Sequence, residues 1–301
     1  MMENKDKKVV ISNSQNPLVS IGLPVFNGLQ KKNEYSTDIS KTLKSILNQT
    51  YQNIEVIISD NCSTDDTANI IKEIIANDKR VKFFQQIKPL GPGENFTFVL
   101  NKAKGKYFKW NCHDDFISEN FIEENLKFLE ENKNFIFCSS PSCYDFEYQE
   151  KRNIVKFDFE SSLFRRIRQF HQIRSKCLSM VYGLIKKEYL LKTTEFTKDY
   201  LAIDWIVVLE LLFQGKFKTI DEGLIVIGSS GRSADKDHLK RSHYFNKFIY
   251  YFLPYFELNK VCVKKSLNSK ELSILEKFFL IFTTLKINLA YMYFYKIKKK
   301  R

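Results

Sequence analysis

The 301 residues suffice for one medium-sized domain with an appendage, or for two small domains. Hydrophobic residues make up 44% and aromatic residues 15% of the chain, which excludes a disordered, collagen-like or coiled-coil protein. The 48 Lys and Arg residues exceed the 35 Asp and Glu residues by 13, so we expect an anionic partner such as nucleic acid, a membrane surface or a phosphorylated ligand.

Short apolar strands alternate with amphipathic helices through the first 140 residues. Residues 1–16 precede them as a charged, loose tail whose apolar run is too short for a signal peptide. We expect strands at 18–25, 54–59, 81–84, 107–110 and 135–138. The intervening helices carry apolar residues at helical spacing: Ile39, Leu43, Ile46 and Leu47; Ile70, Ile71, Ile74 and Ile75; Phe96, Val99 and Leu100; Ile122, Leu126 and Leu129. This alternation predicts βαβ units and an α/β fold with a doubly wound, mostly parallel sheet.

Polar clusters follow three of these strands. They are Pro24–Asn27, Asp60–Asp66 and His113–Asp115. Ligands of doubly wound sheets bind outside the carboxyl ends of the strands, so we expect the functional site where these three clusters meet.

The pattern is less regular after residue 140. Cys177–Ile185 is interpreted as a strand, and Ile203–Phe213 as an apolar helix that stops at Gly215. Two short strands are expected at Phe217–Ile220 and Leu224–Ile227.

Five segments follow one another in the first half of the chain with a recognisable order and spacing. They are the strand Val19–Asn27, the helix Thr42–Tyr51 ending in Gln-Thr-Tyr, the strand and loop Ile54–Thr67, the pair Gly91-x-x-x-Asn95 and Lys104–Tyr107, and the carboxylates of His113–Asp115. Together they resemble the family 2 glycosyltransferases, which have the GT-A fold. The likeness continues loosely through Val181–Leu190 and from Asp204 to Gly215, which looks like the acceptor half of members that add one sugar. The Arg-Trp pair of the processive members is missing, so chain-building activity is disfavoured.

The resemblance implies a domain plan and a reaction. Residues 17–239 would form the GT-A domain, with a nucleotide-sugar-binding half at 17–140 and an acceptor half at 141–239, and residues 240–301 a helical, basic extension. The expected activity is inverting transfer of one sugar from a nucleotide-diphosphate sugar, preferably a UDP-sugar, to a hydroxyl of a glycan or lipid-linked glycan in cell-surface glycan assembly. A divalent cation, Mn²⁺ or Mg²⁺, is the implied cofactor.

The donor's nucleotide is assigned to residues that follow the first strands. The resemblance gives Asp60 the recognition of the base; an Asx-turn or a helix cap is the alternative. Pro24, Phe26 and Asn27 would form the wall of the base pocket, although Phe26 could instead be a core residue. Asn95 is assigned to donor binding as well.

The diphosphate and its cation are assigned to the third polar cluster. Asp115 is the expected metal ligand, and Asp114 would face the ribose or the water shell of the metal. An ordinary acidic helix N-terminus is the alternative interpretation of this pair. His113 departs from the acidic residue of many members; as a second metal ligand it would favour Mn²⁺. Arg232 or His238 could close over the diphosphate, or belong to a plain solvated loop.

Asp204 matches the family's general base, which removes the proton of the acceptor hydroxyl. Its position also suits a simple helix N-cap. Asp199 and Asp221 are neighbouring carboxylates with which it could be confused.

Two other functions are disfavoured. A nucleotidyltransferase that forms sugar nucleotides would carry a Gly-rich, basic loop after the first strand, where this chain has Pro24-Val-Phe-Asn-Gly28. A basic, non-enzymatic protein that binds nucleic acid would carry a recognised module, and none is found in the sequence. The second alternative also includes a basic, non-enzymatic protein that binds membranes instead of nucleic acid.

The basic surplus lies mainly in residues 240–301, which hold 14 Lys and Arg, 3 Asp and Glu, and 15 of the 44 aromatic residues. Residues 1–239 then hold 34 basic and 32 acidic residues, a surplus of only 2. Phe278–Tyr295 would span about 27 Å as a helix, marginal for a bilayer and interrupted by Lys286. We expect it to lie on an anionic membrane surface with Lys296–Arg301 at the headgroups; packing against the rest of the chain or a second subunit is the alternative.

The compartment is inferred from the cysteines and from this extension. None of the six cysteines, Cys62, Cys112, Cys138, Cys143, Cys177 and Cys262, forms a C-x-x-C pair or a zinc-finger spacing. We therefore expect reduced thiols in a cytosolic protein, held at the inner face of the cytoplasmic membrane.

Overall fold

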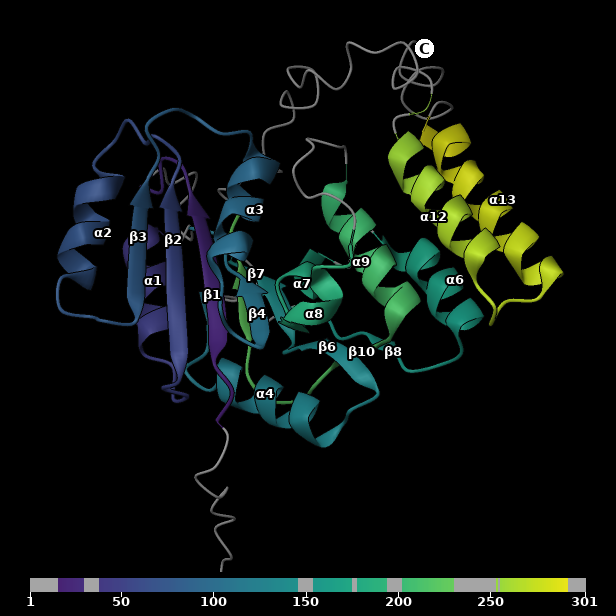
Figure 1. The fold of residues 1–301 in the computed structure, drawn as a ribbon, viewed down its shortest axis with the longest axis horizontal. Coiled ribbons are helices and arrows are strands. Elements are labelled where there is room, and N and C mark those ends of the chain that lie inside the picture. The colour runs from purple at the N-terminus through teal and green to yellow at the C-terminus, as the bar shows by residue number, and fades with distance from the viewer. Residues whose placement is uncertain are drawn as a thin grey trace, which may run out of the picture.

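A large, mostly parallel β-sheet lies at the centre of the computed structural model, with helices on both faces (Figure 1). The structure describes residues 16–29, 38–145, 154–174, 178–193, 202–229, 253 and 255–291. Its strand order is β3 (Val81–Gln85), β2 (Ile54–Asp60), β1 (Val19–Val25), β4 (Tyr107–Trp110), β9 (Leu184–Lys186), β6 (Phe135–Ser139), β10 (Lys216–Thr219) and β8 (Asp158–Phe159). Strands β9 and β8 run antiparallel to their neighbours. The α/β fold class and its mostly parallel sheet are therefore confirmed.

The three polar clusters meet because of how β1 pairs. It runs parallel to β2 on one side and to β4 on the other, with Val25 opposite Asp60 and Gly22 opposite Trp110. The strand order thus reverses at β1, and the carboxyl ends of β1, β2 and β4 lie at one edge of the sheet.

Two hydrophobic layers sandwich the sheet. One face is covered by α1 (Ile39–Leu47), α2 (Thr67–Ile75) and α4 (Phe121–Glu131); the other by α3 (Pro92–Lys102), α6 (Leu163–Ile173), α7 (Leu178–Val181) and α9 (Ile203–Gln214). Strand β1 serves both layers, since its alternate residues point to opposite faces. Ile21 and Leu23 join the α1 layer. Gly22 faces α3, where a Cβ would come within 2.7 Å of Val99 and Phe108.

A small second sheet covers the edge where the polar clusters meet. It consists of β5 (Phe116–Ile117), β11 (Ile225–Ile227) and β7 (Ser142–Tyr144), with β11 in the middle. Because β5 directly follows Asp115 and β11 directly precedes Gly228, this sheet brings residues from the second half of the chain onto the loop that carries Asp114 and Asp115.

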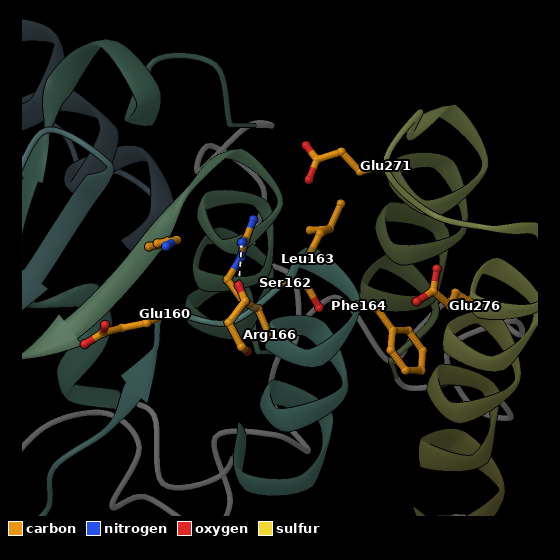
Figure 2. A pocket seen from close by; sticks show the side chains of 9 residues that line it. Glu160, Ser162, Leu163, Phe164, Arg166, Glu271 and Glu276 are labelled. Atoms are coloured by element: carbon orange, nitrogen blue, oxygen red, sulfur yellow. Dashed lines mark hydrogen bonds between the residues drawn. The ribbon is translucent and has the colours of Figure 1, made fainter.

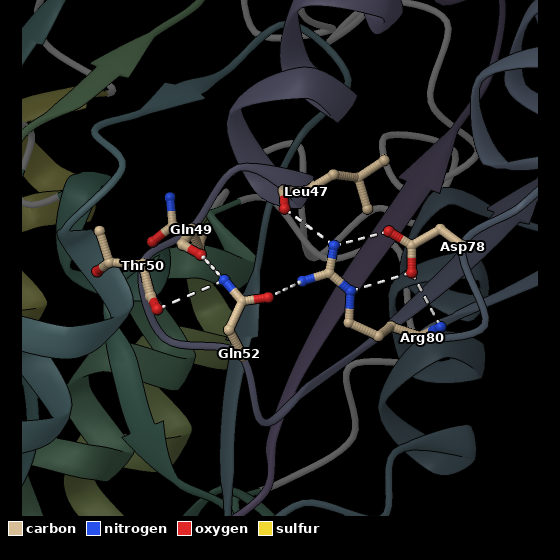
Figure 3. Close-up of polar contacts among 6 residues, drawn as sticks. All are labelled: Leu47, Gln49, Thr50, Gln52, Asp78 and Arg80. Carbon is tan, nitrogen blue, oxygen red and sulfur yellow. Dashed lines mark hydrogen bonds and ion pairs between the residues drawn. The ribbon is translucent and has the colours of Figure 1, made fainter.

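A polar corner at the opposite edge joins α1 to the starts of β2 and β3 (Figure 3). Arg80 pairs with Asp78 at 2.6 Å and donates to the Leu47 carbonyl at 2.9 Å and to Gln52 Oε1 at 3.1 Å. Gln49 Nε2 donates to the Ser118 carbonyl at 2.7 Å. The Gln-Thr-Tyr segment after α1 thus makes a structural connection, through Gln49, to the residue that follows β5.

The expected strand at Cys177–Ile185 is wrong. The described part of this segment is the helix α7 followed by a turn and β9, which is followed in turn by α8 (Lys187–Leu190). The turn is at Gly183, where a Cβ would lie 2.3 Å from the Cys138 carbonyl oxygen. Periodicity does not distinguish a short buried helix from a strand, and the close approach at Gly183 depends on a distant strand.

The helical C-terminal region forms two helices that pack on the rest of the chain. Helix α12 (Phe256–Asn268) lies against α9, and α13 (Ile274–Tyr291) lies against α12 and α6. A buried polar cluster joins α6, α12 and α13: His171 Nε2 of α6 lies 3.0 Å from Thr284 Oγ1 of α13 and 3.5 Å from Cys262 Sγ of α12. Packing against the rest of the chain, the alternative left open by the sequence, therefore accounts for one side of α13. Across the residues whose structure is described, every helix is too short or too polar to cross a bilayer.

We expect Gly105→Ala to lower the free energy of unfolding by about 1–3 kcal/mol, because a Cβ there would lie 2.6 Å from the Leu18 carbonyl oxygen and 2.7 Å from Ser20 Oγ. Denaturant titration measures the loss. Gly91→Ala is the matched control, since its Cβ would meet only the flexible end of Glu94, at 3.3 Å. Equal losses in the two variants would contradict the packing assigned to Gly105.

Candidate active site

Asp60 stands at the end of β2 and is fully buried. Its Oδ1 accepts hydrogen bonds from the Ser63 amide at 3.3 Å and from the Ser63 hydroxyl. Its Oδ2 is also buried and finds no donor within the described part of the chain. One oxygen thus forms the local turn that the sequence left as an alternative, and the other retains an unused acceptor for a ligand N–H group.

The loops after β1 and β2 are tied together by Asn27. Its side-chain Oδ1 accepts a hydrogen bond from the Thr64 backbone amide at 2.8 Å, and its backbone amide donates to Ser63 Oγ at 2.8 Å. Its backbone is left-handed, with φ 49°, a conformation that Asn tolerates better than most residues. Asn27 therefore supports the loop beside Asp60, and a contact with the donor stays a prediction.

Phe26 projects from the same loop with 52% of its surface exposed. The core alternative for Phe26 is therefore wrong, and its ring is available to a ligand. Pro24, one residue inside β1, is buried and pairs with Ser59 of β2.

The side chain of Asn95, in the first turns of α3, is hydrogen-bonded to β2. Its Oδ1 accepts from Ser59 Oγ at 2.6 Å, and its Nδ2 donates to the Ser59 carbonyl at 3.2 Å. These bonds fix the residue that precedes Asp60. The side chain thus has a structural role, and direct donor binding by Asn95 stays a prediction.

Asp114 and Asp115 lie in the loop after β4, each only 2% exposed. Asp115 accepts from the Gly228 amide through Oδ1 at 3.0 Å and from the Cys112 amide through Oδ2 at 3.4 Å. Burial, together with repulsion from Asp114, raises the pKa of Asp115 well above its ordinary value. Gly228 must be glycine, because a Cβ there would lie 2.4 Å from Asp114.

Lys109, on β4, is a fully buried cation near this pair. Its Nζ donates to the carbonyls of Trp110 at 2.9 Å and Tyr182 at 2.8 Å. Burial lowers the pKa of Lys109, and the charge of Asp115 opposes that shift. The lysine therefore offsets part of the negative charge while joining β4 to the turn before β9.

A divalent cation fits this loop if the donor supplies further ligands. Within the described ranges, no three His, Cys, Asp or Glu side chains gather closely enough to hold a metal ion by themselves. Mg²⁺ and Mn²⁺ in phosphate-transfer sites commonly take one or two carboxylates and complete their shell with phosphate oxygens and water. Two buried, mutually repelling carboxylates match that donor set. His113 is partly exposed beside them, and its carbonyl accepts from Thr42 Oγ1 at 2.8 Å.

Asp204 lies in the first turn of α9 and is partly exposed. The N-cap position belongs to Ala202, with a left-handed backbone of φ 58°, so the simple N-cap interpretation of Asp204 is wrong. Desolvation raises the pKa of Asp204 to about 6, and hydrogen bonds from the backbone of Trp205 and of Asp204 itself oppose the shift. A carboxylate with a pKa near 6 is suited to accept a proton at neutral pH.

Tyr182 connects Asp204 with the carboxylate loop. Its phenol shares a hydrogen bond with the Cys112 side chain, and the charges of Asp115 and Asp204 both act on it, adding to the rise in its pKa caused by burial. Both carboxylates therefore lie within electrostatic range of one phenol. Asp115 and Asp204, from opposite halves of the chain, therefore both lie in the neighbourhood of the Tyr182 side chain.

Sequence reasoning missed four residues of this site: Lys109, Tyr182, Gly228 and Asp145. Asp145 is 2% exposed and accepts from the Ser229 amide and hydroxyl at 3.0 and 2.8 Å, which anchors the segment after β11. A lysine within an otherwise apolar strand was the one available signal, since such a charge needs a partner when the strand is buried. The other three depend on contacts between distant segments.

Arg232, His238 and Asp199 lie outside the described residues. Asp221 is exposed and pairs with Lys156 at 2.7 Å, so it is separate from the site. A cavity of about 310 Å³ lies between the start of α6 and the turn that joins α12 to α13, the two helices that form the C-terminal hairpin. It is lined by Arg166, Glu271 and Glu276 among others (Figure 2). It contains none of the residues predicted to bind the donor.

The chain matches known glycosyltransferases in sequence. The model of glycosyl transferase family 2 matches residues 20–190. An uncharacterized glycosyltransferase of Haemophilus influenzae is 38% identical over 128 residues, covering 40% of this chain and 48% of that protein. Another, of Rickettsia typhi, is 30% identical over 200 residues, covering 62% and 58%. The chain thus spans about half the length of these curated relatives.

Solved structures share the fold at low sequence identity. The crystal structure of S. aureus TarS 1–349 in complex with UDP-GlcNAc has a TM-score of 0.66 at 16% identity, covering 93% of this chain and 76% of that one. The mannosyltransferase PcManGT from Pyrobaculum calidifontis, in complex with GDP-Man and Mn²⁺, has a TM-score of 0.54 at 16% identity, with 93% and 76% covered.

These likenesses agree with the α/β fold and its mostly parallel sheet. The structural neighbours show a GT-A fold, as the sequence motifs predict. The family match covers more than half of the chain. The chain belongs to glycosyltransferase family 2.

Proposed function

We propose that this chain transfers one sugar from a nucleotide-diphosphate sugar to an acceptor hydroxyl, with inversion at the anomeric carbon. The observation that carries the proposal is that Asp115, in the loop after β4, and Asp204, in the first turn of α9, both act electrostatically on the buried phenol of Tyr182. A buried carboxylate pair can hold a divalent cation that in turn binds the diphosphate of a donor, and a carboxylate with a raised pKa suits an acceptor hydroxyl. This pair of functions is what glycosyl transfer requires.

The donor proposed is a UDP-sugar, bound with its base against Asp60. The free, buried Oδ2 of Asp60 suits the N–H of a uracil ring, and exposed Phe26 offers a surface for stacking. The TarS structure in complex with UDP-GlcNAc supports this choice of nucleotide. Pro24 and Asn27 would complete the wall, and Asn95 would hold Asp60 in place through Ser59.

The proposed reaction is a single displacement. Asp204 accepts the proton of the acceptor hydroxyl while that oxygen forms a bond to the anomeric carbon. The bond from the anomeric carbon to the phosphate oxygen breaks on the opposite side, and the nucleoside diphosphate leaves with the electron pair. The transition state has oxocarbenium character.

Asp115, with Asp114 and His113 beside it, would hold a divalent cation together with the donor's diphosphate. When bound, the cation would neutralise the charge that develops on the leaving group. The Mn²⁺ in the PcManGT structure supports a cation in this fold, and we propose that this chain binds Mn²⁺ or Mg²⁺. Arg232 would add a further positive charge near the diphosphate.

We further propose that the acceptor is a glycan or a lipid-linked glycan of the cell surface, and that transfer takes place at the inner face of the cytoplasmic membrane. The surplus of 11 positive charges in residues 240–301 supports that location, since this face carries anionic lipids.

We expect Asp60→Asn to weaken UDP binding by about tenfold to a hundredfold, because the carboxylate acceptor for the base N–H is lost. Isothermal titration calorimetry with UDP and Mn²⁺ measures the change. Asp66→Asn is the matched control, because Asp66 is exposed in the same loop. Unchanged affinity in Asp60→Asn would contradict the assigned base pocket.

We expect Asp204→Asn to lower kcat by about a hundredfold to ten-thousandfold with little change in the dissociation constant of UDP, because the amide cannot accept the proton. Release of UDP from a UDP-sugar in the presence of acceptor measures kcat. Asp221→Asn, an exposed carboxylate near β10, should keep full activity. If Asp204→Asn retained wild-type kcat, another base would have to be sought.

The pH dependence of kcat should report Asp204. Its pKa is raised to about 6, so the basic form dominates above pH 6 and is lost as the pH falls. We expect kcat to fall by about tenfold per pH unit below that point and to level off above it. A profile that stays flat down to about pH 4, the ordinary range of an aspartate, would contradict the raised pKa.

A further inference from the structure

Exposed apolar side chains are concentrated on the C-terminal hairpin. Eight of the thirteen large hydrophobic residues found exposed in the described part of the chain lie between Leu267 and Leu289. Six of them form one stripe along α13, which we call the outer face, and each is 44–78% exposed: Leu275, Phe278, Phe279, Phe282, Leu285 and Leu289. Their spacing of three and four residues places them on one side of the helix.

The opposite side of α13 is already occupied by protein. Leu280, Thr284, Ile287 and Asn288 are buried. Thr284 bonds to His171 of α6, and Asn288 Oδ1 accepts from the Tyr255 amide at 2.8 Å. The buried side is thus more polar than the exposed one, the reverse of an ordinary surface helix. A stripe of phenylalanine and leucine turned outward indicates that a further partner covers it.

The position of α13 leaves this side accessible to a broad surface. Figure 1 shows α13 at the edge of the molecule farthest from β3 and α2. Phe279 marks one border of the outer face, where its ring meets Phe164 at 5.5 Å and the Arg168 guanidinium at 5.6 Å. Lys286 lies on the outer face with its ammonium 4.5 Å from the centre of the Phe282 ring, so its stem runs along the apolar stripe. A lysine in this arrangement can reach a headgroup while its stem stays in an apolar layer.

Charge distinguishes between the two candidate partners of the outer face, a second copy of the chain and a lipid surface. A second copy of the chain would add a second segment 240–301 with its own surplus of 11 positive charges. Like charges on the two copies disfavour that pairing wherever they come within the Debye length of about 8 Å. An anionic lipid surface attracts the same charges, including the run of Lys296, Lys298, Lys299, Lys300 and Arg301 that follows α13 in sequence.

We propose that the outer face of α13 inserts its phenylalanine and leucine side chains into the surface of an anionic bilayer while its other side stays bound to α6 and α12. The sequence predicts membrane contact for the whole segment, and the structure limits it to one side of one helix. Because α12 packs on α9, whose first turn holds Asp204, this attachment fixes the orientation of the site relative to the lipid surface. The proposal is independent of the transfer reaction, since vesicle binding needs neither donor nor acceptor.

Flotation of the full chain with vesicles tests this proposal. We expect binding to vesicles of phosphatidylethanolamine with about 30% phosphatidylglycerol, and a loss of at least about tenfold when the vesicles are neutral phosphatidylcholine. The variant Phe278→Ser, Phe282→Ser, Leu289→Ser should lower binding to the anionic vesicles by at least about tenfold, since all three side chains would leave water on binding.

The matched control replaces three exposed apolar residues elsewhere, Ile87→Ser, Ile154→Ser and Leu191→Ser, and should bind vesicles like the wild type. Circular dichroism and the Tm verify that both triple variants remain folded. Retained binding in the α13 variant, absence of binding in the wild type, or equal loss in the control would each overturn the proposal. So would a wild-type dimer in light scattering that the α13 variant converts to a monomer, because the outer face would then be an interface between copies.

Discussion

The burial of Asp114 and Asp115 at the end of β4 is the constraint on which the site depends. Two carboxylates at 2% exposure repel each other, and an unpaired buried charge costs several kcal/mol. The protein offsets this cost with the cation of Lys109 and with the amides of Gly228 and Cys112. The remaining negative charge attracts cations, which is why we propose that the divalent cation binds at this loop.

Holding these carboxylates also joins the two halves of the chain. Gly228 follows β11 of the small second sheet, and its lack of a side chain permits the close approach to Asp114. Lys109 donates a hydrogen bond to the Tyr182 carbonyl in the turn before β9. The negative charges of Asp115 and Asp204 both raise the pKa of the Tyr182 phenol. The candidate site therefore draws on residues from both halves of the chain, and the Gly228 amide from the second half helps to stabilise the charge of Asp115 in the first.

The strands and the site's location could be predicted because they depend on local patterns. Apolar runs between polar turns predicted β1, β2 and β4, and parallel topology placed Asp60 and Asp115 at one edge. Two features could not be predicted in this way, because each depends on a distant contact: the helix α7 before Gly183 and the close approach of Gly228 to Asp114. Asp204 is an intermediate case. Its helix was predicted, whereas its exclusion from the N-cap follows from the left-handed backbone of Ala202.

The central claim is that Asp60 binds the base of one donor, that Asp115 binds its diphosphate through a cation, and that Asp204 accepts the proton of the acceptor hydroxyl. A crystal structure of the chain with a UDP-sugar and Mn²⁺ tests it most directly. The account predicts the uracil N–H on Asp60 Oδ2, the cation between Asp115 and the diphosphate, and the anomeric carbon facing Asp204. A nucleotide bound elsewhere, such as in the cavity beside Arg166, or a sugar turned away from Asp204, would contradict it.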